Sequence, residues 1–320
     1  MTQKVVITRK ILPIAKEMLE AEGFTVIEGN NSAMEPEELQ KHLSDAKGLI
    51  SMLNDSINGE ILSKAPHLKV ISNYAVGFDN IDVEEAKRKD IKVGNTPDVL
   101  TNATAELTLS LILSVLRNHR ENFQFIKDGG WKDWMPSHLL GHELNELKVG
   151  IVGMGRIGKK TAQIIHHGFG SKIYYSHTKE LSDVTEKLNA TFLSIEELFE
   201  TCELISFHCP LNEKTNGLVT YELLKRTPKT FYLINTARGK IIETQGLMKA
   251  LDEKLITACA LDVTEPEPLP VGHPLYQYSN CTILPHIGSS TFKARTLMAK
   301  RAAENIIAGL KGKELPYSVF

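Results

Sequence analysis

Short apolar runs alternate with amphipathic stretches along the N-terminal part of the chain. Apolar residues at helical spacing predict helices over residues 12–22 and from Pro36 to Leu43, where Pro36 stands in the first helical turn. Continuous apolar runs predict strands over residues 4–8, 24–27, 48–52, 69–73 and 92–93. Strands that alternate with helices are typical of a parallel sheet with helices on both faces.

A second alternating series follows a long apolar helix, which the pattern predicts over residues 102–118. Between them lies an irregular segment, residues 128–146, which holds both tryptophans. The strands of the second series are predicted over residues 148–152, 172–175, 204–208, 230–235, 258–261 and 282–284. Only one helix, residues 291–310, then remains. Because one helix cannot bury an apolar face alone, we expect it to pack back on the first part of the chain.

The two series and the returning helix define the expected domain organisation. A chain of 320 residues suits two domains of about 100–200 residues each. We predict an α/β fold with two Rossmann-like or flavodoxin-like parallel-sheet domains, the second inserted into the first. The discontinuous domain would cover residues 1–98 and 288–320, and the inserted domain residues 99–287.

Composition and charge remove several classes of protein. The sequence is 42% hydrophobic and 24% charged, as in ordinary globular proteins, which excludes wholesale disorder. The chain has 37 lysine and arginine residues against 39 acidic residues, and no block of like charge. Its charge therefore provides no electrostatic attraction to nucleic acids or anionic membranes, which excludes them as expected partners. The most apolar stretch, residues 107–116, is about half a membrane span, and the N-terminal apolar run is too short for a signal peptide.

The cysteines indicate the compartment. They stand singly, without a CxxC pair or a histidine-rich companion, which is typical of reduced, mostly buried thiols rather than a disulfide or zinc framework. They are Cys202, Cys209, Cys259 and Cys281. We therefore expect a cytoplasmic protein without a metal site.

A glycine-rich loop follows the first strand of the second series. Residues 153–158 read GMGRIG, a GxGxxG motif between a strand and a helical stretch, residues 159–167. Gly153 permits the tight turn, Gly155 lets a pyrophosphate approach the backbone, and Gly158 lets helix and strand pack closely. The motif also occurs in structural turns, but this order of strand, glycines and helix favours dinucleotide binding, with the helix N-terminus facing the anion. Two further loop residues are expected to contact the cofactor, Arg156 and Ile157.

The end of the next strand bears on the choice of cofactor. An NAD site usually places Asp or Glu about 20 residues after the glycines, where it binds the ribose hydroxyls. This chain has no carboxylate there to repel a 2′-phosphate, and its side chains can all bind one: Ser176, His177, Thr178 and Lys179. NADP(H) is therefore favoured, while NAD(H) and a merely solvated role for His177 and Lys179 stay open.

Three consecutive strand ends carry side chains suited to chemistry. Arg238 follows the strand at 230–235, Glu267 follows the next, and His286 follows the third. Ligands of open α/β sheets lie at such carboxyl ends. Taken singly, these residues read as a surface charge, a loop carboxylate and a turn residue. Their occurrence together, downstream of a nucleotide loop, favours a catalytic site.

The sequence resembles the D-isomer-specific 2-hydroxyacid dehydrogenase family over essentially its full length. The matching segments are residues 76–82, the glycine loop, and residues 235–239, 262–268 and 285–289. The sequence around Glu267 and the paired tryptophans are most similar to the glyoxylate/hydroxypyruvate reductase branch. The resemblance implies NAD(P)H-dependent reduction of a small 2-keto acid to the D-2-hydroxy acid by hydride transfer.

The resemblance also implies roles for individual residues. His286 would donate the proton, since imidazole titrates near neutral pH, and Glu267 would orient its ring. Arg238 would hold the substrate carboxylate and polarise the carbonyl. The backbone of Val76 and Gly77 would hold the other side of the carboxylate. Asp262 would bond the nicotinamide carboxamide, and the remaining cofactor contacts would come from Thr104, His208, Pro210 and Thr236. No metal is implied.

The substrate loop of the family corresponds to residues 51–56. It contains no Arg or Lys and one acid, which disfavours phosphorylated substrates, and Leu53 would shape a small tail pocket. Glyoxylate and hydroxypyruvate are therefore the leading substrates, with 2-ketogluconate as the alternative. A second alternative is a non-catalytic NAD(H)-sensing protein similar to the C-terminal-binding-protein corepressors, which the near absence of tails disfavours.

The segment around Trp131 and Trp134 is the predicted dimer arm. Exposed tryptophans normally need burial, and aromatic residues are enriched at interfaces. The alternative is that both simply cover their own domain. The resemblance favours a homodimer.

Overall fold

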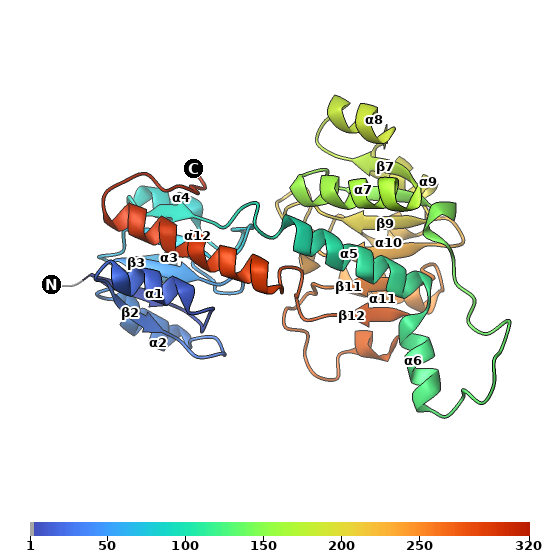
Figure 1. Ribbon diagram of the computed structural model, residues 1–320, viewed down its shortest axis with the longest axis horizontal. Helices are drawn as coiled ribbons and strands as arrows, with labels where there is room; N and C mark the ends of the chain where they lie inside the picture. Colours follow the sequence, from blue (N-terminus) through green and yellow to red (C-terminus); the bar gives the residue numbers. More distant parts are fainter. Residues whose placement is uncertain (1–2) are drawn as a thin grey trace. The chain divides into compact units, whose positions relative to one another are not determined.

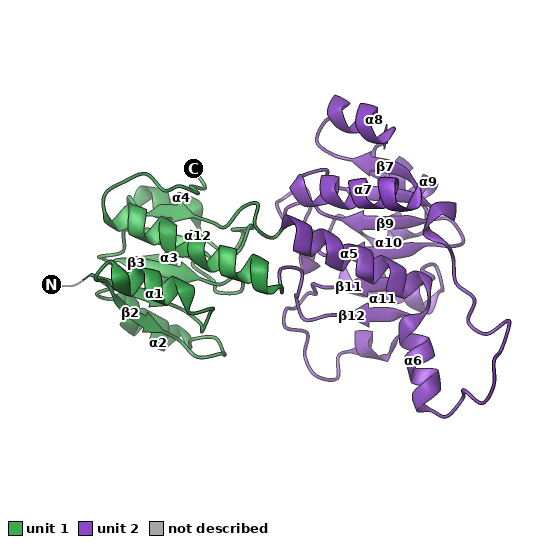
Figure 2. Ribbon diagram, in the orientation of Figure 1, with its two compact units in different colours: residues 1–100, 290–320 green, residues 101–289 purple. Residues whose placement is uncertain are grey.

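The computed structural model describes residues 3–320, which divide into two compact units (Figure 2). Unit 1 holds the residues up to 100 together with 290–320, and unit 2 holds residues 101–289. The boundaries expected from the sequence are 98 and 287. No helix within residues 3–320 combines the length and the apolar character needed to cross a membrane.

Unit 1 contains a parallel sheet of five strands. Its strands are β1 (Lys4–Ile7), β2 (Thr25–Glu28), β3 (Gly48–Ser51), β4 (Val70–Asn73) and β5 (Lys92–Gly94). They pair in the order β2-β1-β3-β4-β5, which is the flavodoxin-like order. All five lie within or beside the apolar runs that predict them. The signal is strongest for β1, β3 and β4, because strands buried on both faces have continuous apolar sequences.

Helices cover both faces of this sheet (Figure 1). They are α1 (Ile14–Ala21), α2 (Pro36–Leu43), α3 (Gly59–Ser63), α4 (Val83–Arg88) and α12 (Phe292–Leu310). Helix α12 packs on α1 and on the strands β3 and β4, as expected for the returning helix. The buried Asn305 ties it to the sheet, since its Nδ2 donates to Ser72 Oγ at 3.1 Å and to Asn95 O at 3.0 Å.

Unit 2 contains a parallel sheet of seven strands. They are β6 (Lys148–Val152), β7 (Lys172–Ser176), β8 (Thr191–Phe192), β9 (Leu204–Phe207), β10 (Tyr232–Asn235), β11 (Ala258–Leu261) and β12 (Cys281–Ile283). The order is β12-β11-β10-β9-β6-β7-β8. The direction of winding reverses between β6 and β9, and ligands of open α/β sheets bind outside the carboxyl ends of the strands at this point.

Helices lie on both faces of the second sheet (Figure 1). They are α5 (Thr101–Leu116), α6 (His119–Lys127), α7 (Arg156–Phe169), α8 (Ser182–Leu188), α9 (Ile195–Thr201), α10 (Tyr221–Leu224) and α11 (Thr244–Asp252), with 3-10 turns η1 (Leu144–Glu146), η2 (Gly239–Ile241) and η3 (Pro274–Gln277). Alternate strand residues serve two separate cores. Ile234 packs in the core beneath α5 and α7, while its neighbour Leu233 packs in the core beneath α9 and α11.

The α/β prediction with two parallel sheets is confirmed, and the differences are local. The sequence pattern does not predict the short helices α3, α4 and α8–α11, and it does not predict α6 or β8. Helix α6 buries none of its residues and β8 is two residues long, so neither leaves a core-facing pattern in the sequence. All four cysteines carry free thiols and are buried, as their spacing predicts.

Candidate active site

Three neighbouring strands of unit 2 present their carboxyl ends side by side. Strands β10, β11 and β12 are adjacent in the sheet, and the loops that follow them carry Arg238, Glu267 and His286 in that order. The parallel register pairs Asn235 of β10 with Leu261 of β11, and Leu261 with Ile283 of β12. The three loops therefore begin at one edge of the sheet.

His286 and Glu267 form a direct pair. The Nδ1 atom of His286 lies 2.6 Å from Oε1 of Glu267, and the two side chains are only 21% and 27% exposed. A carboxylate is an acceptor, so this contact assigns a proton to Nδ1. The Nε2 atom is then the ring position left to exchange a proton with a ligand.

Asp262 holds the loop that carries His286. Its carboxylate is buried and accepts backbone N–H groups from Ile287 at 2.7 Å and from Gly288 at 2.8 Å, and its carbonyl accepts the N–H of His286 at 2.8 Å. Burial raises the pKa of this carboxyl, against the opposing effect of the two N–H donors and of His286. His286 has a φ of +53°, which is uncommon for a residue with a side chain, so these three bonds maintain an unfavourable backbone conformation.

Threonines brace the same loop from α5. Thr104 Oγ1 donates to Gly288 O at 3.1 Å, and Thr108 Oγ1 lies 2.8 Å from Thr104 O and 3.0 Å from Thr236 Oγ1. Thr104 and Thr236, both predicted cofactor contacts, are thus joined through Thr108. The structure places them beside the His286 loop and at the end of β10.

The loop of Arg238 is closed by Asn235. Its Oδ1 accepts the N–H of Ala237 at 3.0 Å, and its Nδ2 donates to Arg238 O at 2.8 Å. A Cβ on Gly239 would lie 1.9 Å from Thr264 O, so only glycine lets this loop pass so close to the one after β11. The partly buried Arg238 donates from its guanidinium to Ala237 O at 2.8 Å.

The glycine loop has the geometry that a dinucleotide requires. Gly153 has a φ of +92°, and a Cβ there would lie 2.4 Å from Cys209 N. A Cβ on Gly158 would lie 2.1 Å from Gly153 O, so this glycine permits α7 to pack on the loop. A Cβ on Gly155, by contrast, would meet nothing within 4 Å, and this residue caps the N-terminus of α7, where Arg156 and Ile157 begin the helix. Open space before a helix N-terminus fits a pyrophosphate.

Strand β7 delivers the predicted ribose-binding residues beside this loop. Ser176 ends the strand, and its carbonyl accepts the N–H of Gly153 at 2.9 Å. His177 Nδ1 accepts the N–H of Met154 at 3.4 Å, which turns the ring toward the glycines, while Thr178 and Lys179 are exposed. The next carboxylate, Glu180, accepts from Thr185 at 3.4 Å.

His208 follows β9 and cannot serve as an acid. Its Nε2 lies 2.9 Å from Ser206 Oγ, and within residues 3–320 its buried Nδ1 makes no hydrogen bond. Burial lowers the pKa of His208 to about 3, so the ring is neutral at working pH. Pro210, two residues later, is exposed, and its carbonyl accepts from Thr215 Oγ1 at 2.7 Å.

The predicted substrate contacts of unit 1 stand at the carboxyl ends of β3 and β4. Leu53 is partly buried in the loop after β3, and Val76 and Gly77 form the turn after β4. The carbonyls of this turn are occupied, because Val76 O accepts Asn95 Nδ2 and Gly77 O accepts Asn73 Nδ2, each at 2.8 Å.

Sequence reasoning missed the residues that hold these segments. Arg9, after β1, lies 3.6 Å from the carboxylate of Asp55, so a cation stands beside a loop that has none of its own. Asn80 also bonds this loop. Two signals pointed to them: Arg9 follows a predicted strand, and Asn80 lies within the matching segment 76–82.

Comparisons with known proteins agree on one family. The profile of the "D-isomer specific 2-hydroxyacid dehydrogenase, NAD binding domain" matches residues 109–288. A glyoxylate reductase of Thermofilum pendens is 43% identical over 316 residues, which is 98% of this chain and 93% of that protein.

Solved structures give the same answer. The TT0316 protein of Thermus thermophilus superimposes with a TM-score of 0.93 at 40% identity, covering 99% of this chain and 100% of its own. An NADPH-dependent glyoxylate/hydroxypyruvate reductase of Sinorhizobium meliloti, solved with NADP and malonate, has a TM-score of 0.88 at 26% identity and covers 100% and 97%. With its sheet order, its glycine loop and these relatives, the chain belongs to the D-isomer-specific 2-hydroxyacid dehydrogenase family.

Proposed function

We propose that this protein reduces glyoxylate and hydroxypyruvate to the corresponding 2-hydroxy acids, with NADPH as the preferred reductant. Membership of the family makes it an NAD(P)-dependent oxidoreductase. The Thermofilum pendens relative is named a glyoxylate reductase, and the Sinorhizobium meliloti structure a glyoxylate/hydroxypyruvate reductase. The observation that carries the proposal is the contact between His286 and Glu267 at the sheet edge that adjoins a dinucleotide loop.

The residues of unit 2 hold the cofactor in this proposal. Gly155 and the N-terminus of α7 receive the pyrophosphate, and Asp262 and Thr104 adjoin the nicotinamide. When bound, the reduced nicotinamide supplies a hydride to the carbonyl carbon of the substrate. Preference for NADPH is supported by the absence of a carboxylate in residues 176–179, since Asp or Glu there would repel a 2′-phosphate.

His286 supplies the proton in this proposal. The ring holds the proton at Nε2 and donates it to the carbonyl oxygen, because Nδ1 is engaged by Glu267. The charge of Glu267 balances that of the ring while the ring is protonated. The three bonds from the loop to Asp262 keep the imidazole in place between turnovers.

Arg238 holds the carboxylate of the substrate in this proposal. A guanidinium presents two N–H donors in a plane, which matches a carboxylate, and it stays charged throughout the working pH range. Unit 1 serves as the substrate domain, with Leu53, Val76 and Gly77 as its contacts. These roles follow the family resemblance of residues 51–56 and 76–82.

Steady-state kinetics with a panel of 2-keto acids and both reduced cofactors test the proposal. We expect glyoxylate and hydroxypyruvate to outrank 2-ketogluconate, and NADPH to outrank NADH. His286→Ala should lower kcat by about 10²–10⁴-fold, which is the usual contribution of a positioned acid. An inactive wild-type protein that still binds NADH would instead favour a sensing role, and near-normal turnover of His286→Ala would remove this residue from the mechanism.

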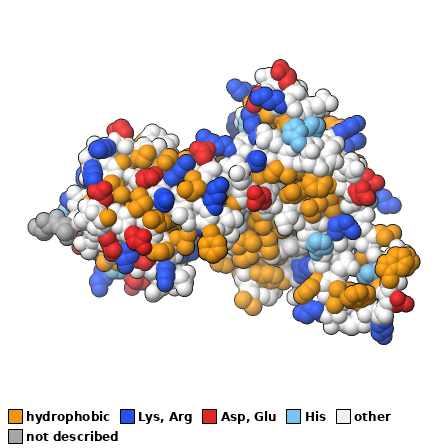
Figure 3. Space-filling model, viewed as in Figure 1, with side chains coloured by type: hydrophobic (Ala, Val, Ile, Leu, Met, Phe, Trp, Pro, Cys, Tyr) orange, Lys and Arg blue, Asp and Glu red, His pale blue; other side chains and the backbone are white. Residues whose placement is uncertain are grey.

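We further propose that the protein is a homodimer, joined through the arm after α5. Large apolar side chains gather there, over α6 and the segment that follows it in the chain (Figure 3). Trp131 is 67% exposed and Trp134 is 81% exposed, and contiguous apolar exposure of this kind marks interaction surfaces.

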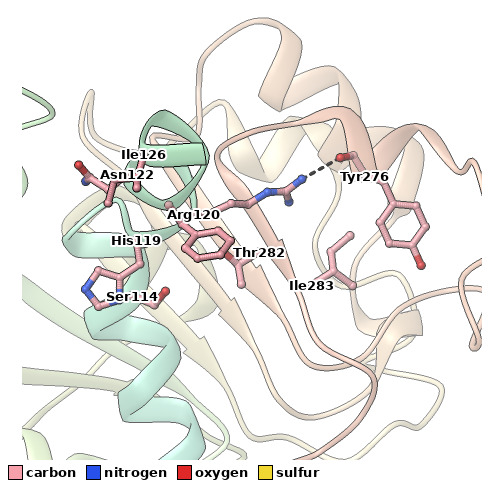
Figure 4. A pocket seen from close by; sticks show the side chains of 9 residues that line it. Ser114, His119, Arg120, Asn122, Ile126, Tyr276, Thr282 and Ile283 are labelled. Carbon is pink, nitrogen blue, oxygen red and sulfur yellow. Dashed lines mark hydrogen bonds between the residues drawn. The ribbon is translucent and has the colours of Figure 1, made fainter. Parts of the chain in front are cut away.

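A cavity of about 690 Å³ adjoins the same helix (Figure 4). Arg120 of α6 spans it, donating to Tyr276 O at 2.8 Å and also to Cys281 O.

The paired variant Trp131→Asp/Trp134→Asp should be monomeric by light scattering, while the wild type should be dimeric. A monomeric wild-type mass at micromolar concentration would refute the dimer.

A further inference from the structure

The substrate loop of unit 1 is fastened by a set of side-chain amides. The loop leaves β3 at Ser51 and makes a tight turn in which Asp55 N donates to Met52 O at 3.1 Å. Leu53 sits inside this turn and is only partly buried. Its own packing therefore does not determine where the turn lies.

Asn80 bonds both ends of that turn. Its Nδ2 donates to Met52 O and to Asp55 O, each at 3.0 Å. Its main chain joins the exit of the loop as well, because Ile57 N donates to Asn80 O at 2.9 Å. One side-chain amide thus bonds the carbonyls on either side of Leu53.

Asn73 connects Asn80 to the turn after β4. The two amides face each other, with Asn73 Nδ2 2.9 Å from Asn80 Oδ1 and Asn80 Nδ2 3.4 Å from Asn73 Oδ1. The same Asn73 Nδ2 donates to Gly77 O at 2.8 Å, and its Oδ1 accepts from Ser51 Oγ at 2.9 Å. A continuous line of hydrogen bonds therefore runs from Gly77 to the loop of Leu53.

The opposite side of the loop is held by Asp55. Its Oδ2 accepts Thr8 Oγ1 at 2.5 Å and Met52 N at 2.7 Å, and its Oδ1 lies 3.6 Å from the guanidinium of Arg9. The contacts with Thr8 and Arg9 fix the loop to the residues just after β1, while the Asn80 amide fixes it on the side of β4.

We propose that Asn80 is a positioning residue, which sets the distance between the Leu53 loop and the Val76–Gly77 turn and thereby the affinity for the keto acid. This inference rests on the proposed function, in which both segments contact the substrate. Removing the amide takes one hydrogen bond from each of the Met52 and Asp55 carbonyls and leaves one N–H of Asn73 without its acceptor, so the loop loosens from the turn. All the proposed cofactor contacts lie in unit 2, so cofactor affinity stays unchanged.

Asn80→Ala tests the inference by separating KM from the other parameters. We expect KM for glyoxylate or hydroxypyruvate to rise by about tenfold or more, as misplacement of a contact segment does, with the Kd for NADPH within about twofold of wild type. Asn80→Asp is the second variant. It keeps an acceptor for Asn73 and loses both donor bonds to Met52 and Asp55, so it should raise KM in the same way. Wild-type KM in Asn80→Asp would overturn the inference.

Asn58→Ala is the matched control. Asn58 is an exposed asparagine of the same unit whose Oδ1 caps α3 by accepting Ile61 N at 3.1 Å, outside the set of amides. Its loss should lower Tm and leave KM unaltered, because a cap contributes to stability only. A KM rise in Asn58→Ala as large as that in Asn80→Ala would show a general effect of destabilisation and overturn the inference.

Hydrogen exchange of the ligand-free protein gives a readout that needs no substrate. Amides of residues 51–57 should exchange faster in Asn80→Ala than in wild type or Asn58→Ala. Unchanged exchange, or faster exchange with wild-type KM, overturns the inference while the proposed function stands. A wild-type protein that reduces no keto acid overturns the proposed function and this inference with it.

Discussion

The partly buried imidazole of His208, whose Nδ1 is fully buried, should make the protein lose stability as the pH falls. Burial lowers the pKa of this ring to about 3, from 6.5 in a solvated histidine. Below pH 6.5 the unfolded chain therefore takes up a proton that the folded protein does not, and the free energy of unfolding falls. The stability is fully present above pH 6.5 and is lost progressively as the pH drops toward 3.

The size of the effect follows from the two pKa values. At pH 7.5 about a tenth of the unfolded chains carry the proton, whereas at pH 5 nearly all do. Because pH 5 lies about 1.5 units below 6.5, and each unit corresponds to about 1.4 kcal/mol, His208 alone should remove about 2 kcal/mol between these pH values.

The matched variant is His208→Gln, whose amide nitrogen can occupy the place of Nε2 beside Ser206 Oγ. Urea unfolding followed by circular dichroism at pH 7.5 and pH 5 gives the pH-dependent loss for each protein. The loss should be smaller in the variant by about 2 kcal/mol, whatever the variant's absolute stability. Equal losses in the two proteins would show that His208 is solvated or protonated in the folded state, and the reasoning from burial would fail.

Three further predictions concern the active site and are measured by steady-state kinetics. Arg238→Lys should lower kcat/KM by about a hundredfold, because an ammonium cannot make the two-pronged contact with a carboxylate, and a change below threefold would refute this role. In Asp262→Asn, the amide oxygen can still accept one of the N–H groups of residues 287 and 288, but the amide NH₂, which is a donor, faces the other N–H. We therefore expect kcat to fall by about tenfold or more, while circular dichroism shows that the protein stays folded. His177→Asp should raise the ratio of KM for NADPH to KM for NADH by about tenfold, since a carboxylate repels the 2′-phosphate, and an unchanged ratio would place the phosphate elsewhere.

The elements buried on both sides were the easiest to predict from the sequence. Strands such as β3 and β6 are almost continuously apolar in sequence. The order of strand, glycines and helix at residues 148–169 is compatible with few folds other than a dinucleotide-binding one. Helix α6 could not be predicted in this way, because none of its side chains is buried and their spacing in the sequence does not indicate a face that packs against a core.

The site could be predicted as a set of residue types but not as a set of contacts. The order of strand ends places Glu267 and His286 at one edge, yet the sequence does not reveal that Asp262 uses both carboxylate oxygens to hold the His286 loop. The same holds for Arg9 and Asn80, which meet the substrate loop only through the register of β1, β3 and β4. Contacts between loops of distant sequence depend on that register, which local patterns do not encode.

Helix α12 also determines when the first sheet can be completed. The strands β1–β5 leave the ribosome early, but the helix that covers them through Asn305 is translated only after the whole of unit 2. Nascent chains fold by domains in the order of their synthesis. The sheet of unit 2, although second in the sequence, can therefore finish folding first. One face of the sheet of unit 1 stays exposed until the last turns of α12 have been synthesised.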